Sequence, residues 1–85
     1  MNKEIFINIF MLVQEQVKID NDRDHALEKA FGPDTYIMME NKLLDKLVDL
    51  LEMELNADED TFFSFVFDKS RTKEEISEFW ERYVI

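Results

Sequence analysis

The chain has 85 residues, of which 20 are acidic and 10 basic, so its net charge is −10. This charge repels phosphates and anionic lipids, so we expect neither direct nucleic-acid binding nor membrane binding. The chain contains no cysteine, which excludes disulfides, thiolate metal ligands and thiol catalysis. Its length fits a single domain over residues 1–85, and its apolar content of 46% is enough for a folded core.

The first predicted helix covers residues 3–18, because its apolar residues recur with a helical period. The isoleucines at its start also permit a strand, but the longer pattern favours the helix. The apolar stretch is interrupted by Asn8 and no small-residue cleavage site follows, so we expect no signal peptide. No run approaches the roughly 18 apolar residues of a membrane span, and we expect a cytoplasmic location. The residues expected on the buried face are Phe6, Ile9, Phe10, Val13 and Val17.

A polar segment is expected to end this helix and to start a second one over residues 22–31. Short polar side chains favour a helix start because they accept hydrogen bonds from free backbone N–H groups. Gly32 and Pro33, the only residues of their kinds, are expected to end this second helix. The candidate N-caps are Asp20, Asn21 and Asp22. The residues expected to face the core are Ala26, Leu27, Ala30 and Phe31.

The same polar segment has the aspartate spacing of a calcium loop, at Asp20, Asp22 and Asp24. Such a loop needs Gly at its sixth position and Glu at its twelfth, where this chain has His25 and Phe31. A lone histidine also supplies too few ligands for a zinc site. We therefore expect no metal and no cofactor. The chain has no Gly-rich phosphate loop and no nucleophile beside a base, so we expect no catalytic residues and no enzyme.

The longest predicted helix covers residues 39–55 and forms the centre of the predicted fold. Residues 34–37 are expected to lead into it as a short extended or turn connection. Its leucines form a broad apolar stripe, which indicates that at least two other helices pack against it. The leucines of the stripe are Leu44, Leu47, Leu51 and Leu55.

Two shorter helices are expected after this one. Residues 61–68 are apolar almost all round, which indicates a buried or interface helix, with a strand as the alternative. Thr72 and Glu75 have the spacing of a capping box, and the amphipathic pattern of a last helix follows them. Together these patterns predict an all-α fold, a compact bundle of four to five helices around residues 39–55.

Acidic residues indicate a surface for binding a basic partner protein. Asp45, Asp49 and Glu52 recur at i, i+4 and i+7 on the outer side of the central helix, although Lys42 and Lys46 offset part of their charge. Such a surface could imitate the charge of DNA and block the basic groove of a DNA-binding protein. The alternative is a solvated face that keeps a small protein soluble. A second acidic run, at Asp58, Glu59 and Asp60, is expected to begin the aromatic helix.

The chain contains eight Phe, two Tyr and one Trp, which is more than a small core needs. Aromatic residues that cannot be buried mark an interface, so Phe63 and Phe67 are candidates for self-association as a homodimer. Two functions therefore stay open: a non-enzymatic acidic inhibitor of a basic protein, and a homo-oligomeric assembly protein.

Three segments in this order resemble small acidic proteins encoded by phages and prophages of Gram-positive bacteria. They are HALEKAFG at residues 25–32, KLLDKLVDLLEMEL at residues 42–55 and DTFFSFVFD at residues 60–68. The resemblance carries no functional residues with it. It implies a bacterial host cell, in which phage proteins of this kind include inhibitors of restriction and CRISPR nucleases. By analogy it favours a blocking protein that acts on a nucleic-acid-handling host enzyme.

Overall fold

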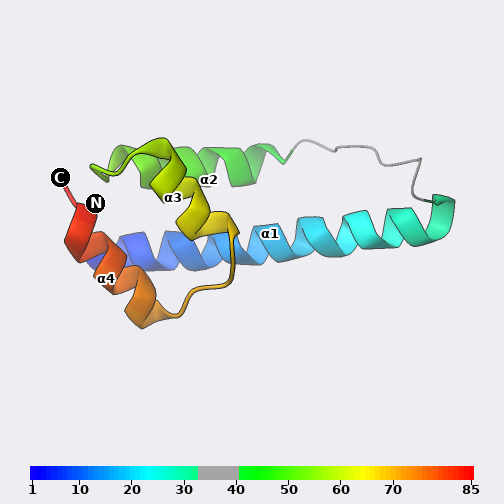
Figure 1. Cartoon of the computed structure of the whole chain (residues 1–85), viewed down its shortest axis with the longest axis horizontal. Coiled ribbons are helices and arrows are strands. Elements are labelled where there is room, and N and C mark those ends of the chain that lie inside the picture. Colours follow the sequence, from blue (N-terminus) through cyan, green and yellow to red (C-terminus); the bar gives the residue numbers. More distant parts are fainter. Residues whose placement is uncertain (33–40) are drawn as a thin grey trace.

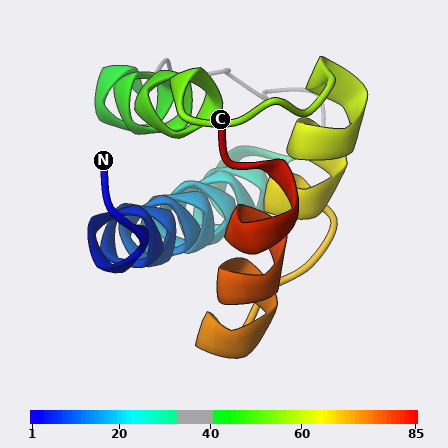
Figure 2. The same ribbon diagram turned by 90° about the vertical axis from the view of Figure 1, so that its left-hand side faces the viewer.

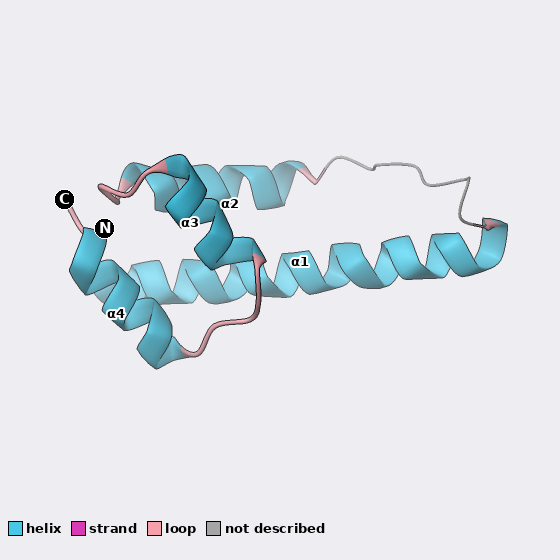
Figure 3. Cartoon of the chain, in the orientation of Figure 1, coloured by secondary structure: helices cyan, strands magenta, loops and turns pink. Residues whose placement is uncertain are grey.

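The computed structural model describes residues 1–32 and 41–85. Predictions for the segment between them, which concern Pro33, the extended connection and the start of the leucine-rich helix, lie outside the described residues. The described chain is all-α, as predicted (Figures 1 and 3). The only β pairing among the described residues is an isolated bridge between Leu55 and Val84. The helices are α1 (Lys3–Phe31), α2 (Lys42–Met53), α3 (Glu59–Phe67) and α4 (Lys73–Tyr83).

The predicted break near residue 20 is wrong, because α1 continues through it as one helix of 29 residues. The cap of this helix is Asn2, whose side chain accepts a hydrogen bond from the Ile5 N–H at 2.8 Å. None of the three predicted N-caps begins a helix. The Asp20 carboxylate instead accepts a hydrogen bond from the Asn41 amide at 3.0 Å and lies 3.6 Å from the Arg23 guanidinium. Because these contacts occupy the carboxylate, it does not cap a new helix. No Gly or Pro interrupts the segment either, so α1 continues through it.

The second half of α1 projects past the other helices, so its predicted inward residues are not buried (Figure 1). Phe31 is 67% exposed, and Ala26 and Ala30 are exposed as well. Gly32 ends the helix as predicted, with φ at +88° and its N–H bonded to the Glu28 carbonyl at 2.8 Å. The molecule measures 45 × 20 × 19 Å, and its radius of gyration is 14.5 Å. A compact chain of this length would have about 12 Å, and the projecting helix accounts for the difference.

The longest helix is therefore α1, and the prediction that residues 39–55 form it is wrong. The leucine-rich helix α2 spans 12 residues; it begins after the cap Asn41 and ends at Met53. Its apolar stripe faces the core as predicted, since Leu51 is fully buried and Leu44 and Leu47 are partly buried against it. Leu55 is buried too, but it lies beyond the end of the helix.

The two C-terminal helices agree with the sequence patterns. The aromatic segment is a helix and not a strand, and it begins at Glu59, within the acidic run that was predicted to start it. The capping box is present at the start of α4. There the Glu75 N–H donates to the Thr72 hydroxyl at 3.2 Å, and the Thr72 N–H donates to the Glu75 carboxylate at 3.1 Å.

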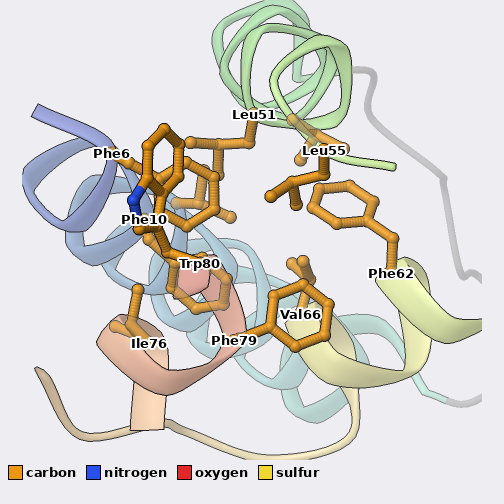
Figure 4. Close-up of a cluster of buried hydrophobic side chains, with 11 residues drawn as sticks. Phe6, Phe10, Leu51, Leu55, Phe62, Val66, Ile76, Phe79 and Trp80 are labelled. Carbon is orange, nitrogen blue, oxygen red and sulfur yellow. The ribbon is translucent and has the colours of Figure 1, made fainter. Parts of the chain in front are cut away.

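The helices form two layers around one aromatic-rich core. Figure 2 shows α1 and α2 side by side, with both α3 and α4 on the same side of this pair. In the core, Phe6 packs against Trp80, with ring centroids 4.9 Å apart (Figure 4). Phe10 packs against the partly buried Phe65, with ring centroids 5.4 Å apart. None of the described helices is long and apolar enough to cross a membrane. The buried residues are Phe6, Phe10, Val13, Val48, Leu51, Leu55, Phe62, Val66, Ile76, Phe79 and Trp80.

Candidate partner-binding groove between α2 and α3

The position of α2 is fixed by the residue that begins it. The Asn41 side-chain oxygen accepts a hydrogen bond from the Leu44 N–H at 3.0 Å, which caps α2. The amide nitrogen of the same side chain donates to the Asp20 carboxylate and, at 3.3 Å, to the Gln16 side chain, both on α1. One side chain therefore starts α2 and joins it to α1, which sets the direction in which the outer residues of α2 point.

The aromatic helix α3 is started by Asp58. Its carboxylate accepts a hydrogen bond from the Thr61 N–H at 2.8 Å, and the hydrogen bonds from Thr61 lower the pKa of Asp58. Because Glu59 and Asp60 occupy the first turn, the positive end of the helix dipole stabilises their charge. The second predicted acidic run therefore has a structural role at the start of α3.

A groove of about 430 Å³ lies between α2 and α3. This volume falls within the range of small ligand-binding sites. Its apolar wall includes Phe63 and Phe67, whose ring centroids are 6.1 Å apart. Its acidic wall is made by Asp45 and Asp49, which are both exposed. The groove residues are Leu44, Asp45, Val48, Asp49, Phe63 and Phe67.

Two features predicted separately thus meet in one place. Asp45 and Asp49 were expected on an acidic face, and Phe63 and Phe67 on a self-association face. Through their side chains, the two aspartates form no ion pair or hydrogen bond with any residue that the structure describes. Phe67 is 46% exposed. The groove therefore offers unpaired negative charge directly beside exposed aromatic surface.

The other predicted acidic residues do not join this groove. Glu52 is partly buried and does not line it. Asp58 caps α3, and Asp60 lines a different cavity between α3 and α4. The nearby Glu54, which is not among the predicted residues, forms an ion pair with the N-terminal ammonium at 3.4 Å.

The cavity between α3 and α4, of about 550 Å³, is built around Arg71, a residue that the sequence patterns did not single out. Its guanidinium lies 4.3 Å from the centre of the Phe65 ring, which stacks on Phe79 at 4.0 Å. The guanidinium is also 3.5 Å from the Glu75 carboxylate. The position of Arg71, four residues before Glu75, was the only signal in the sequence. Besides Arg71, the cavity is lined by Asp60, Glu78 and Arg82, so charges of both signs meet there, whereas the charged residues of the groove are acidic only.

Among residues 1–32 and 41–85, no group of three or more His, Asp or Glu side chains is placed to hold a metal ion. The groove has the chemistry of a protein-binding surface, with apolar area for an anchor side chain and carboxylates for flanking cations. Comparison of the chain with protein-family models, curated proteins and solved structures gives no match.

Proposed function

We propose that this chain is a non-enzymatic acidic binding protein that holds a basic segment of a partner protein in the α2–α3 groove. The proposal depends on one observation: Asp45 and Asp49, which have no side-chain partner among residues 1–32 and 41–85, line the same groove as Phe63 and Phe67. A segment that fits would place an apolar side chain against the phenylalanines and Lys or Arg against the aspartates. Because Lys and Arg carry long apolar stems, they suit a surface of this kind.

The class of partner follows from the charge of the whole chain. A net charge of −10 attracts proteins with clustered Lys and Arg, and such clusters are typical of proteins that bind nucleic acid. Occupation of such a cluster would prevent it from contacting phosphates. We therefore propose that the chain blocks or modulates a basic, nucleic-acid-handling protein, by imitating the charge of DNA. The resemblance to phage proteins supports a host enzyme as the partner and a bacterial cytoplasm as the location.

The test begins with proteins captured from a bacterial lysate by the immobilised chain, with elution by increasing salt. Each captured protein is purified, and its affinity for duplex DNA is measured with and without the free chain. We expect one captured protein to lose DNA binding when the chain is added, and to bind the chain more weakly as salt rises.

The variant Asp45→Asn/Asp49→Asn assigns the effect to the groove. Because the two aspartates are exposed, their removal should weaken binding about 2- to 30-fold, from about 0.2–1 kcal/mol for each pair. The control Asp22→Asn/Glu28→Gln removes the same charge from exposed positions on α1 and should bind as the parent does. Equal affinities for the two double variants would show that only net charge matters, and the proposed groove would be rejected.

A further inference from the structure

The side of the α1–α2 pair that faces away from α3 and α4 carries a second exposed surface, which is apolar. Figure 2 shows that no described helix covers this side. We call it the back face. It carries five of the large hydrophobic residues that are most exposed in the described chain. They are Ile5 (47% exposed), Leu12 (47%), Ile19 (51%), Leu43 (55%) and Leu50 (44%).

Helix geometry places these residues on one side of the molecule. Successive residues are about 100° apart around a helix axis. On α1, Leu12 and Ile19 lie about 160° and 180° from Phe10, which contacts Phe65 of α3. On α2, Leu43 lies about 140° and Leu50 about 160° from Val48, which lines the groove with α3. Both sets therefore point away from the α3–α4 layer.

The back face is bordered by opposite charges. Glu15 lies at the outer edge of α1 and Lys46 at the outer edge of α2, both exposed and neither in an ion pair with a described residue. The two helices run antiparallel, with Asn41 level with Gln16 and Asp20 (Figure 1). Lys46 is five residues after Asn41, which is about 7.5 Å along α2 in the direction of the start of α1. Measured along the two helices, Lys46 and Glu15 are therefore separated by less than about one helical turn.

We propose that the back faces of two copies of this chain pack together as a homodimer. The dimer has its two-fold axis parallel to the helices, so α1 of each copy lies against α2 of the other. This arrangement places Glu15 of each copy opposite Lys46 of the second copy, at both edges. The four packed helices then form an antiparallel bundle around the ten apolar side chains of the two back faces. Like-charged copies can approach here because the centre of the face carries no net charge.

The size of the face fits a dimer interface. The part of α1 up to Ile19 is about 25 Å long, and two adjacent helices are about 20 Å wide, which gives a footprint of about 500 Å² per copy. Two such footprints reach the roughly 1,000 Å² that a specific interface requires. The α2–α3 groove lies on the opposite side of α2, so both grooves of a dimer would stay accessible. A partner with two basic segments could then bind both grooves at once.

The first experiment measures mass against concentration by light scattering and sedimentation. We expect a species of twice the 10.3 kDa chain mass at micromolar concentration. Leu12→Lys should raise the dimer dissociation constant by at least about thirtyfold, since it buries an unpaired charge in the interface. Phe31→Lys is the control: it introduces the same charge at an exposed α1 position outside the face and should leave the dimer intact. If Leu12→Lys loses helicity by circular dichroism, the more exposed Leu43→Lys replaces it.

The second experiment tests the orientation of the two copies by charge exchange. Glu15→Lys and Lys46→Glu each change two ion pairs of the dimer, so each should weaken it about 2- to 30-fold, and the double variant should restore the parent affinity. A chain that is monomeric at all concentrations overturns the dimer proposal. A Leu12→Lys variant that keeps its helicity and still dimerises as the parent does overturns it as well. Single charge variants that dimerise as the parent does overturn the proposed orientation. No partner protein is needed, so these results are independent of the groove.

Discussion

Replacement of Asn41 by Ala should destabilise the fold more than its partly exposed position suggests. Its side chain has two roles at the same time: the oxygen caps α2, and the amide nitrogen donates to Asp20 on α1. Loss of an N-cap costs about 0.5–2 kcal/mol. Loss of a hydrogen bond to a charged group costs about 1.5–3 kcal/mol. Because Arg23 remains close to Asp20, the second cost should lie at the lower end of its range, and we expect a total of about 2–3 kcal/mol.

Asn41→Ser separates the two roles, since a serine hydroxyl can cap α2 but is too short to replace the amide donor. It should cost about 1.5 kcal/mol, which is the loss of the hydrogen bond to Asp20 alone. The assay is urea unfolding followed by circular dichroism at 222 nm, with thermal unfolding as a second measure. For Asn41→Ala, we expect the melting temperature to fall by on the order of 10 °C or more. Equal losses for Ser and Ala, or a loss below about 0.5 kcal/mol for Ala, would refute the two-role interpretation.

Three further predictions concern the core, the pH dependence and the projecting helix. Phe10→Ala should cost about 3–5 kcal/mol in urea unfolding because Phe10 is fully buried, whereas Phe31→Ala should stay within about 0.5 kcal/mol. Since hydrogen bonds from Thr61 lower the pKa of Asp58, its contribution to stability is present at neutral pH and is lost as the pH falls below about 4. Asp58→Asn keeps a capping oxygen but cannot ionise, so the free energy of unfolding should fall less steeply below about pH 4. An unchanged fall would contradict the contribution of Asp58 to acid stability. Hydrogen exchange should be faster at the amides of residues 20–31 than in the first half of α1, and uniform protection along α1 would contradict the observed packing.

Local patterns predicted the all-α fold and the start of α4, because these depend on hydrophobic periodicity and on capping within a few residues. The continuity of α1 depends on contacts from elsewhere in the chain. Asp20 has a side chain that favours a helix start, but the structure uses it as an acceptor for Asn41, 21 residues later. A sequence pattern contains no sign of that partner, so the local pattern alone predicts a break between two helices.

The groove could be predicted only in parts. Helical spacing placed Asp45 and Asp49 together on the outside of α2, and composition marked Phe63 and Phe67 as surplus aromatics. Their meeting depends on the angle between α2 and α3, which the intervening loop and the core packing determine. The back face could not be predicted, because leucines such as Leu12 and Leu43 follow the apolar pattern of their helices, and which of these leucines stay exposed depends on the positions of α3 and α4.

The projecting half of α1 makes this molecule an elongated rotor, with one principal dimension more than twice each of the others. Such a body tumbles end over end more slowly than it spins about its long axis. Backbone N–H bonds in α1 point along that axis, so their nitrogen-15 relaxation should report slower reorientation than bonds that lie across it. Relaxation measured helix by helix would therefore give the shape of the protein in solution directly.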